Sequence, residues 1–275
     1  MNLQNRALET LKQTSRTFYI PIVRLPGELQ DAVASAYLCM RAIDEIEDTP
    51  DLDNHTKAEL LRGISQRMQE VTDVEAYARI GADLACYSDV LPEVSLCVGD
   101  WASLAPDTIA PRIWDATAAM ADRMAYWAEH NWTISTKADL DRYTFSVAGA
   151  VGLLLSDLWA WYDNTKTNRQ DAIAFGRGLQ AVNIVRNQRE DSQRGVNFIP
   201  EGWTNRDVQD YARCQLKQAD LYVEALPKGS PALSFCQIPY ILAKGTLDAI
   251  ALGKPKLSRY DVLNLVEKAT NVKSA

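Results

Sequence analysis

Residues 37–48 read YLCMRAIDEIED, and the spacing of their side chains indicates a helix. On a helix, Asp44 and Asp48 lie one turn apart on the same face, with Arg41 three residues before Asp44 and Tyr37 one turn before Arg41. Two stacked carboxylates repel each other unless a cation lies between them, and their hard oxygen atoms suit Mg²⁺. The alternative is an acidic helix end that faces solvent, as most runs of acids do.

Apolar residues recur along the rest of the chain mostly every three or four positions, and no run alternates as a strand would between hairpin turns. The sequence therefore predicts an all-α protein. Prolines and helix caps place its helices at residues 2–14, 27–47, 56–71, 73–88, 111–131, 137–162, 169–193, 206–225, 232–252 and 258–271. Three of these, 27–47, 137–162 and 169–193, are apolar on more than one face, which predicts a central layer. Because no linker rich in Gly or Ser divides the chain, we expect a single domain over residues 1–275.

The composition is that of an ordinary globular protein and disfavours several classes of function. A chain of 275 residues that is 47% hydrophobic can bury a substantial core. Its net charge of −7 argues against a nucleic-acid partner, because nucleic-acid binding usually needs a basic face. With only His55 and His130, histidine-rich zinc sites and Ser-His-Asp chemistry have little material to work with.

Cysteine usage and hydropathy bear on localisation. Five cysteines without a CxxC pair suit reduced, buried thiols better than disulfides, which predicts a cytoplasmic protein. The N-terminal residues lack the apolar core of a signal peptide, and the longest strongly apolar run, VAGAVGLLL at residues 147–155, is too short to cross a bilayer. We therefore expect no membrane anchor.

A second polar stripe lies in AVNIVRNQREDSQRGVNFIPEGW, residues 181–203. Asn183, Asn187 and Asp191 fall at positions i, i+4 and i+8 on one helix face, and Arg186 is adjacent. The alternative is an ordinary polar stripe whose side chains form hydrogen bonds with neighbouring backbone groups. Two such helices in one apolar bundle instead favour a cage for Mg²⁺ and diphosphate, in which acidic turns face each other across a cavity.

Two further segments carry weaker signals. In YTFSVAGAVGLLLSDLW, residues 143–159, Gly149 and Gly152 each weaken a helix by about 1 kcal/mol relative to Ala, which predicts close approach by another helix or by a ligand chain. In SRTFY, residues 15–19, a polar trio precedes Pro21. That pattern is more typical of a cap and turn than of a phosphate-binding site.

In their order and spacing, SRTFY, AYLCMRAIDEIED, YTFSVAGAVG, LQAVNIVRNQREDSQRGVNFIP and FCQIPYILAKGTLDAI resemble the squalene and phytoene synthase family of head-to-head prenyl diphosphate synthases. The resemblance extends over about residues 14–252. It implies a class I isoprenoid synthase fold, an all-helical bundle with a central channel for prenyl chains. It also implies an enzyme that uses Mg²⁺, two or three ions with the diphosphate, to ionise a prenyl diphosphate, for which farnesyl diphosphate is expected. The need for NADPH stays open.

The resemblance assigns roles residue by residue. It assigns metal binding to Asp44, Asp48, Asn183, Asn187 and Asp191. It assigns catalytic roles to Arg41, Asp44, Asp48 and Tyr143. It assigns substrate binding to Ser15, Arg16, Tyr37, Arg41, Val147, Asn183 and Arg186.

Asn187 and Val196 depart from the family pattern, which has Asp at the first position and commonly Arg at the second. An amide oxygen ligates Mg²⁺ weakly and without charge, so the second metal site is weakened. Head-to-head prenyl transfer remains the main reading. The departures favour the alternative of a prenol-forming diphosphatase or a terpene cyclase, and a catalytically silent prenyl-diphosphate-binding protein is a third possibility. An apolar product also predicts a peripheral membrane contact for its release.

Overall fold

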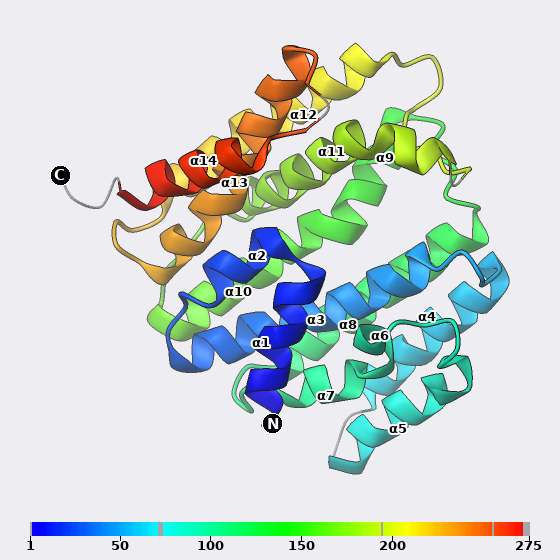
Figure 1. Cartoon of the computed structure of the whole chain (residues 1–275). Coiled ribbons are helices and arrows are strands. Elements are labelled where there is room, and N and C mark those ends of the chain that lie inside the picture. Colours follow the sequence, from blue (N-terminus) through cyan, green and yellow to red (C-terminus); the bar gives the residue numbers. More distant parts are fainter. Residues whose placement is uncertain (1, 71–73, 194, 255, 272–275) are drawn as a thin grey trace. The chain divides into compact units, whose positions relative to one another are not determined.

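The computed structural model describes residues 2–70, 74–193, 195–254 and 256–271, and every regular element in these ranges is helical (Figure 1). The all-α prediction is confirmed. The contacts within the chain divide it into two compact units, Met1–Trp132 and Thr133–Ala275. The single domain over residues 1–275 stays a prediction.

The first unit is built around α3 (Gly27–Asp48), which has buried residues on more than one face, among them Val33, Leu38 and Ile43. It packs against α1, α2, α4, α6, α7 and α8. The other elements of this unit are α1 (Leu3–Thr14), α2 (Arg16–Ile22), α4 (Asn54–Gln69), α5 (Val74–Leu84), η1 (Ala85–Tyr87), α6 (Glu93–Leu96), α7 (Val98–Ser103) and α8 (Ala110–Glu129).

The helix α2 is an element that the sequence does not predict. Ser15 caps it as expected, since its Oγ accepts a hydrogen bond from the backbone N–H of Phe18 at 3.2 Å. The chain nevertheless continues as a helix through Pro21, where only a turn is expected. Proline removes one backbone hydrogen bond there, and the helix ends one residue later. The short α6 and α7 are also unpredicted, since they offer too few residues for a periodic pattern, whereas η1 falls within the helix predicted at 73–88.

The second unit is built around α11 (Arg169–Gln193), which packs against α9, η2, α10, α12 and α13 (Figure 1). Its remaining elements are α9 (Lys137–Thr144), η2 (Phe145–Gly149), α10 (Ala150–Asp163), α12 (Asn205–Ala225), α13 (Pro231–Ala251) and α14 (Arg259–Asn271). The predicted boundaries of these helices agree with the observed ones to within a few residues.

Glycine allows α11 to touch α10 and the adjoining η2 backbone to backbone. A Cβ on Gly152 would lie 2.0 Å from the carbonyl oxygen of Ala172, and a Cβ on Gly176 would lie 2.0 Å from that of Ala148. No side chain fits at such distances, so both positions require glycine. For Gly152, the open choice between a neighbouring helix and a ligand chain is therefore decided in favour of the helix.

The segment η2 is a π-helical turn inside an otherwise continuous helix. The backbone N–H of Ala150 donates to the carbonyl of Phe145, five residues earlier, and the hydroxyl of Ser146 donates to the carbonyl of Arg142 at 2.8 Å. Among the described helices, the stretch Lys137–Asp163 is long and apolar enough to cross a membrane. Half of its most apolar part is buried within the protein, as is also usual for a core helix.

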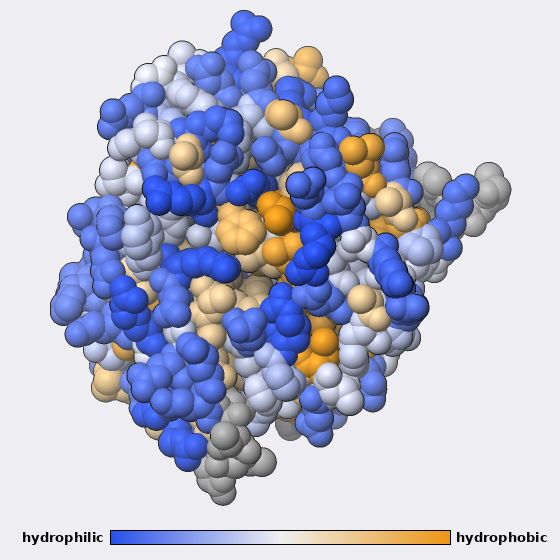
Figure 2. Space-filling model, turned by 180° about the vertical axis from the view of Figure 1, so that it is seen from behind, coloured by the Kyte–Doolittle hydropathy of each residue, from blue (hydrophilic) through white to orange (hydrophobic). Residues whose placement is uncertain are grey.

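On the face shown in Figure 2, hydrophilic residues predominate, and hydrophobic ones gather near its centre and in smaller patches elsewhere. The five cysteines are free thiols, and Cys39 and Cys236 are buried as expected. Cys86 and Cys214 are exposed, so the prediction of buried thiols is wrong for these two, which lie on outward faces of their helices.

Candidate functional site

The first acidic motif lies on the second half of α3. Tyr37, Arg41, Asp44 and Asp48 follow one another at helical spacing along that helix, as predicted. Arg41 forms an ion pair with Glu45 one turn later, and both side chains are only about a quarter exposed, 28% and 25%. Glu45 therefore acts as a counter-ion for Arg41. The sequence offered a signal for this pair, since the two residues are separated by four positions.

In the cluster formed by Arg41, Asp44, Glu45 and Asp48, carboxylates outnumber the positive charge. Burial raises the pKa of Asp44 to about 7; the positive charge of Arg41 opposes this shift, while the negative charges of Asp48 and Glu45 add to it. Burial also disfavours the charged form of Arg41, but the carboxylates of Asp44 and Glu45 outweigh that effect and raise its pKa. A bound cation would relieve this excess of carboxylates.

Arg41 also holds an unused donor. Its Nε is buried and makes no hydrogen bond within the described part of the chain. A buried N–H without a partner is costly, so an acceptor supplied by a ligand would be favoured at this place.

The SRTFY segment lies beside the first motif. Tyr37 and Ser15 share a hydrogen bond, which lowers the pKa of the tyrosine, although burial is the larger effect and raises that pKa to about 12. The rings of Phe18 and Tyr37 lie with their centroids 5.4 Å apart. Ser15 thus both caps α2 and contacts the predicted site. The side chain of Arg16 lies outside what the structure describes.

The second motif occupies the last three turns of α11. The Nε of Arg186 donates to the amide oxygen of Asn187 at 3.0 Å, and the amide of Asn183 donates to Gln180 at 3.4 Å. Asp191 is buried, with 8% exposed, and its carbonyl accepts a hydrogen bond from the backbone N–H of Val196 at 3.0 Å. The oxygen of Asn187 that would ligate a metal is therefore engaged by a neighbouring arginine.

The donor set fits Mg²⁺ shared with a ligand better than a metal enclosed by protein. Among the described residues, no group of three or more His, Cys, Asp or Glu side chains is placed to hold a metal ion. In the first unit, Asp44 and Asp48 offer two carboxylates one turn apart on α3. Mg²⁺ commonly binds one or two carboxylates together with substrate phosphates, so the residues present fit that ion.

Tyr143 belongs to an aromatic stack that the sequence does not reveal. Its side chain is 3% exposed, and its ring lies 4.4 Å from that of Phe198 at an interplanar angle of 16°. Phe198 follows α11 in the chain, so the stack fixes the segment after the second motif against α9. Val147 lies within the π-turn and is partly exposed.

Arg177 ties the end of α9 to α11. Its guanidinium donates to the carbonyl oxygen of Asp141 at 3.0 Å and lies 5.7 Å from the ring centroid of Phe145. The hydroxyl of Tyr211, on α12, donates to the carboxylate of Asp141 at 2.9 Å. The turn that carries Tyr143 is thus held by two neighbouring helices. No spacing rule in the sequence predicts these contacts, because they join residues 36 and 70 positions apart.

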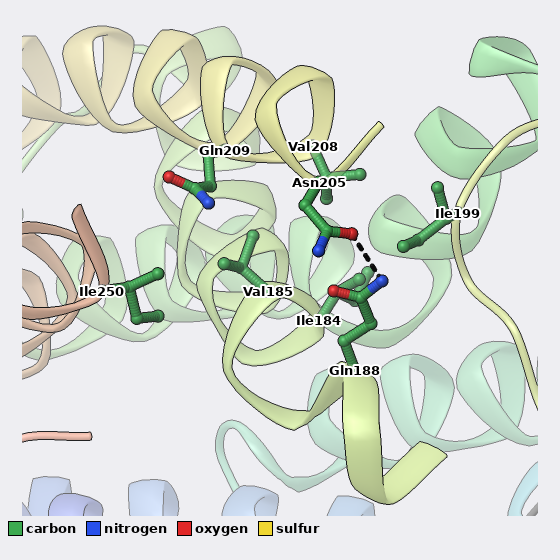
Figure 3. Close-up of a pocket in the computed structure, with 8 residues that line it drawn as sticks. All are labelled: Ile184, Val185, Gln188, Ile199, Asn205, Val208, Gln209 and Ile250. Atoms are coloured by element: carbon green, nitrogen blue, oxygen red, sulfur yellow. Dashed lines mark hydrogen bonds between the residues drawn. The ribbon is translucent and has the colours of Figure 1, made fainter. Parts of the chain in front are cut away.

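A cavity of about 90 Å³ lies beside α11 (Figure 3). It is lined by Ile184, Val185, Gln188, Ile199, Asn205, Val208, Gln209 and Ile250. Two of these residues are joined by a hydrogen bond, in which the amide of Gln188 donates to the side-chain oxygen of Asn205 at 2.6 Å. No predicted site residue lines this cavity, which is too small for a prenyl chain.

A family model described as squalene/phytoene synthase matches residues 11–211. The chain belongs to the squalene/phytoene synthase family. Its relatives include the squalene synthase of Yarrowia lipolytica, which is 30% identical over 97% of this chain and 67% of its own length. The squalene synthase of Eremothecium gossypii is 28% identical over 94% of this chain and 64% of its own length. The chain thus spans less than two thirds of the length of some of these relatives.

Two solved structures share the fold of this family member. TcSQS in complex with the ligand E5700 matches with a TM-score of 0.78 and 21% sequence identity, over 98% of this chain and 86% of the other. A dehydrosqualene synthase in complex with ligand matches with a TM-score of 0.61 and 15% identity, over 99% of this chain and 97% of the other. The isoprenoid synthase fold expected from the sequence is confirmed.

Proposed function

We propose that this chain is a prenyltransferase that binds farnesyl diphosphate, ionises it and joins two such chains head to head. One observation carries the proposal: in a member of this family, the first motif is complete, and its carboxylates, arginine and tyrosine form one part-buried cluster on α3. A C20 prenyl diphosphate would use the same protein groups as the C15 substrate.

The chain's residues suit the removal of diphosphate from an allylic carbon. Mg²⁺ bound by Asp44 and Asp48 would supply positive charge to the departing diphosphate. Arg41 has a buried Nε without a partner and can donate it to a diphosphate oxygen, while Glu45 holds the guanidinium in place. Ser15 and Tyr37 add hydroxyl groups beside it. The stacked rings of Tyr143 and Phe198 offer an aromatic face that can shelter a carbocation from water.

A specific observation favours a second candidate. The amide oxygen of Asn187 is already engaged by Arg186, and Val196 offers no cation. If these residues hold a second diphosphate poorly, the first carbocation would react with water or with its own chain. The products would then be a prenol or a cyclic terpene rather than a coupled chain.

Incubation with farnesyl diphosphate, with and without Mg²⁺ and NADPH, tests the proposal. We expect inorganic diphosphate and an apolar C30 product by mass spectrometry. A C15 alcohol or cyclic hydrocarbon as the main product would support the second candidate instead. Binding of farnesyl diphosphate without release of diphosphate would contradict both. We place the reaction in the cytoplasm, at a membrane surface that can take up the apolar product.

A further inference from the structure

The antiparallel hairpin formed by α13 and α14 ends in an unusual surface. The side-chain amide of Gln237 donates to the carbonyl of Ala269, and Leu265 lies against Gly245. The start of α14 therefore lies beside the end of α13, and the two helices run side by side in Figure 1. The hairpin end is defined here as Leu252, Lys254, Lys256, Arg259, Tyr260 and Leu263.

Large apolar side chains are exposed at the hairpin end. Leu252 is 77% exposed, Tyr260 73% and Leu263 58%. Tyr260 and Leu263 are three positions apart on α14 and share a face, while the inner face of the helix carries Leu265 and the buried Ala269. Single exposed apolar residues are normal, but three within twelve positions indicate an interaction surface.

Positive charge is concentrated at the same place. Lys254, Lys256 and Arg259 are all exposed, although the whole chain has 36 acidic against 29 basic residues. The acid among residues 252–263, Asp261, is turned to the start of α14, where it accepts hydrogen bonds from the backbone N–H and hydroxyl of Ser258 at 3.0 and 2.6 Å. The nearby Asp248 pairs with Arg213 at 3.4 Å. The apolar side chains are therefore accompanied mainly by cations.

We infer that the hairpin end docks on the surface of an anionic phospholipid bilayer. Apolar side chains that insert at the headgroup level, flanked by Lys and Arg, are the combination that such surfaces attract. The acidic remainder of the chain would be repelled, which orients the hairpin end toward the lipid. The inference rests on exposure and charge alone, so it does not depend on the proposed prenyl transfer.

Sedimentation of the full chain with vesicles tests this docking without any substrate. We expect binding to phosphatidylcholine vesicles that contain phosphatidylserine, weakening as salt is added, and little binding to phosphatidylcholine alone. The triple variant Lys254→Glu, Lys256→Glu, Arg259→Glu should weaken binding at least about tenfold. The triple variant Leu252→Ser, Tyr260→Ser, Leu263→Ser should also weaken it.

Matched changes elsewhere serve as controls. Lys166→Glu with Lys228→Glu alters exposed lysines outside the hairpin end, and Leu221→Ser alters an apolar side chain that is 51% exposed on α12. Both should leave binding unchanged. Hydrogen exchange of the wild-type chain with vesicles provides a readout that needs no variant, and new protection should fall within residues 252–265.

Three results would overturn the inference. The first is no binding of the wild type to anionic vesicles. The second is equal binding of the wild type to both vesicle types. The third is binding by both triple variants that is as strong as that of the wild type. A second copy of the chain as the occupant would appear as a dimer in sedimentation velocity that the triple variants abolish, without vesicle binding. That outcome would likewise replace the lipid by a protein partner.

Discussion

Asp44 combines partial burial with two acidic neighbours, and it is the residue on which the proposed chemistry depends most. The change Asp44→Asn should reduce diphosphate release by about 100-fold or more, because it removes a charged ligand from the first motif. The fold should persist, since an amide fits the same space. The rate of diphosphate release from farnesyl diphosphate, together with the melting temperature, measures both effects.

Asp51 provides the control for this prediction. It lies in the exposed segment just after the motif, and Asp51→Asn removes the same charge from the same region. We expect nearly full activity from that variant. Near-normal turnover by Asp44→Asn would exclude the first motif from the mechanism.

Asn187 tests the weakened second motif. Asn187→Asp should lower the Mg²⁺ concentration needed for half-maximal activity, because a carboxylate adds negative charge and a harder oxygen. Its new charge would also pair with Arg186, whose Nε already donates to that position. The matched control is Asn197→Asp, an exposed amide six positions after Asp191.

The double variant Asn187→Asp, Val196→Arg extends the test to product. If the wild type makes mainly alcohol or cyclic hydrocarbon, this variant should shift part of its product to C30 material, since an added guanidinium can hold a second diphosphate. Efficient condensation by the wild type would show that Asn187 already suffices.

At the scale of single residues, the sequence predicts what lies along one helix and misses what joins distant segments. The stripe from Tyr37 to Asp48 follows from helical geometry. The stack of Tyr143 on Phe198 and the contact of Arg177 with Asp141 depend on how α9, α11 and the following loop pack. Local spacing carries no information on such contacts.

At the scale of elements, the contact between α10 and α11 is sensitive to one methyl group. Gly152→Ala should lower the free energy of unfolding by about 1–3 kcal/mol, because its Cβ would overlap the carbonyl of Ala172. Gly63→Ala on α4 is the control, since no atom lies within 4 Å of its Cβ. That change should stabilise by about 0.5–1 kcal/mol. Denaturant unfolding measures both, and a stable Gly152→Ala variant would contradict the close contact.

The start of α9 should respond to pH. Hydrogen bonds from Arg142 and Thr136 lower the pKa of Asp139 from 3.8 to about 2. Because the folded pKa lies below the unfolded one, the carboxylate stabilises the fold above about pH 4, and this contribution is lost as the pH falls from 4 toward 2. Asp139→Asn should lower the melting temperature by a few degrees at pH 7, as expected for loss of a cap of about 1 kcal/mol.

The difference between wild type and Asp139→Asn should narrow steadily as the pH approaches 2. Asp210→Asn, which removes a looser surface pair at 3.8 Å with Arg206, should change the melting temperature little at any pH. A difference for Asp139→Asn that persists unchanged at pH 2 would show that the cap does not depend on its charge.

The elements themselves were largely predictable. Ten helices follow from apolar periodicity because each is long enough to show several turns of it. The exceptions are α2 and the short α6 and α7. In α2, Pro21 suggests a turn, although the helix continues to Ile22. The π-turn was not predictable, because an interrupted period resembles noise in a single sequence.

At the scale of the whole molecule, we propose that Mg²⁺ and the diphosphate of the substrate bind together at the first motif. Mg²⁺ and a non-hydrolysable farnesyl diphosphate analogue should therefore raise the melting temperature together by more than the sum of their separate effects. Thermal melting with each ligand alone and with both measures this coupling. Merely additive shifts would argue against a metal that bridges protein and diphosphate.

The π-turn at Phe145–Gly149 sets the phase between the two halves of its helix. It accommodates one residue more than an α-helix would, and each residue of an α-helix turns the chain by about 100°. Tyr143 precedes this extra residue, whereas Gly152, which contacts α11, follows it. A chain that lost a single residue here would retain every other member of the motif. The ring of Tyr143 would nevertheless be rotated by about a quarter of a turn away from Phe198. A deletion that looks neutral in the sequence would therefore break the stack of these two rings.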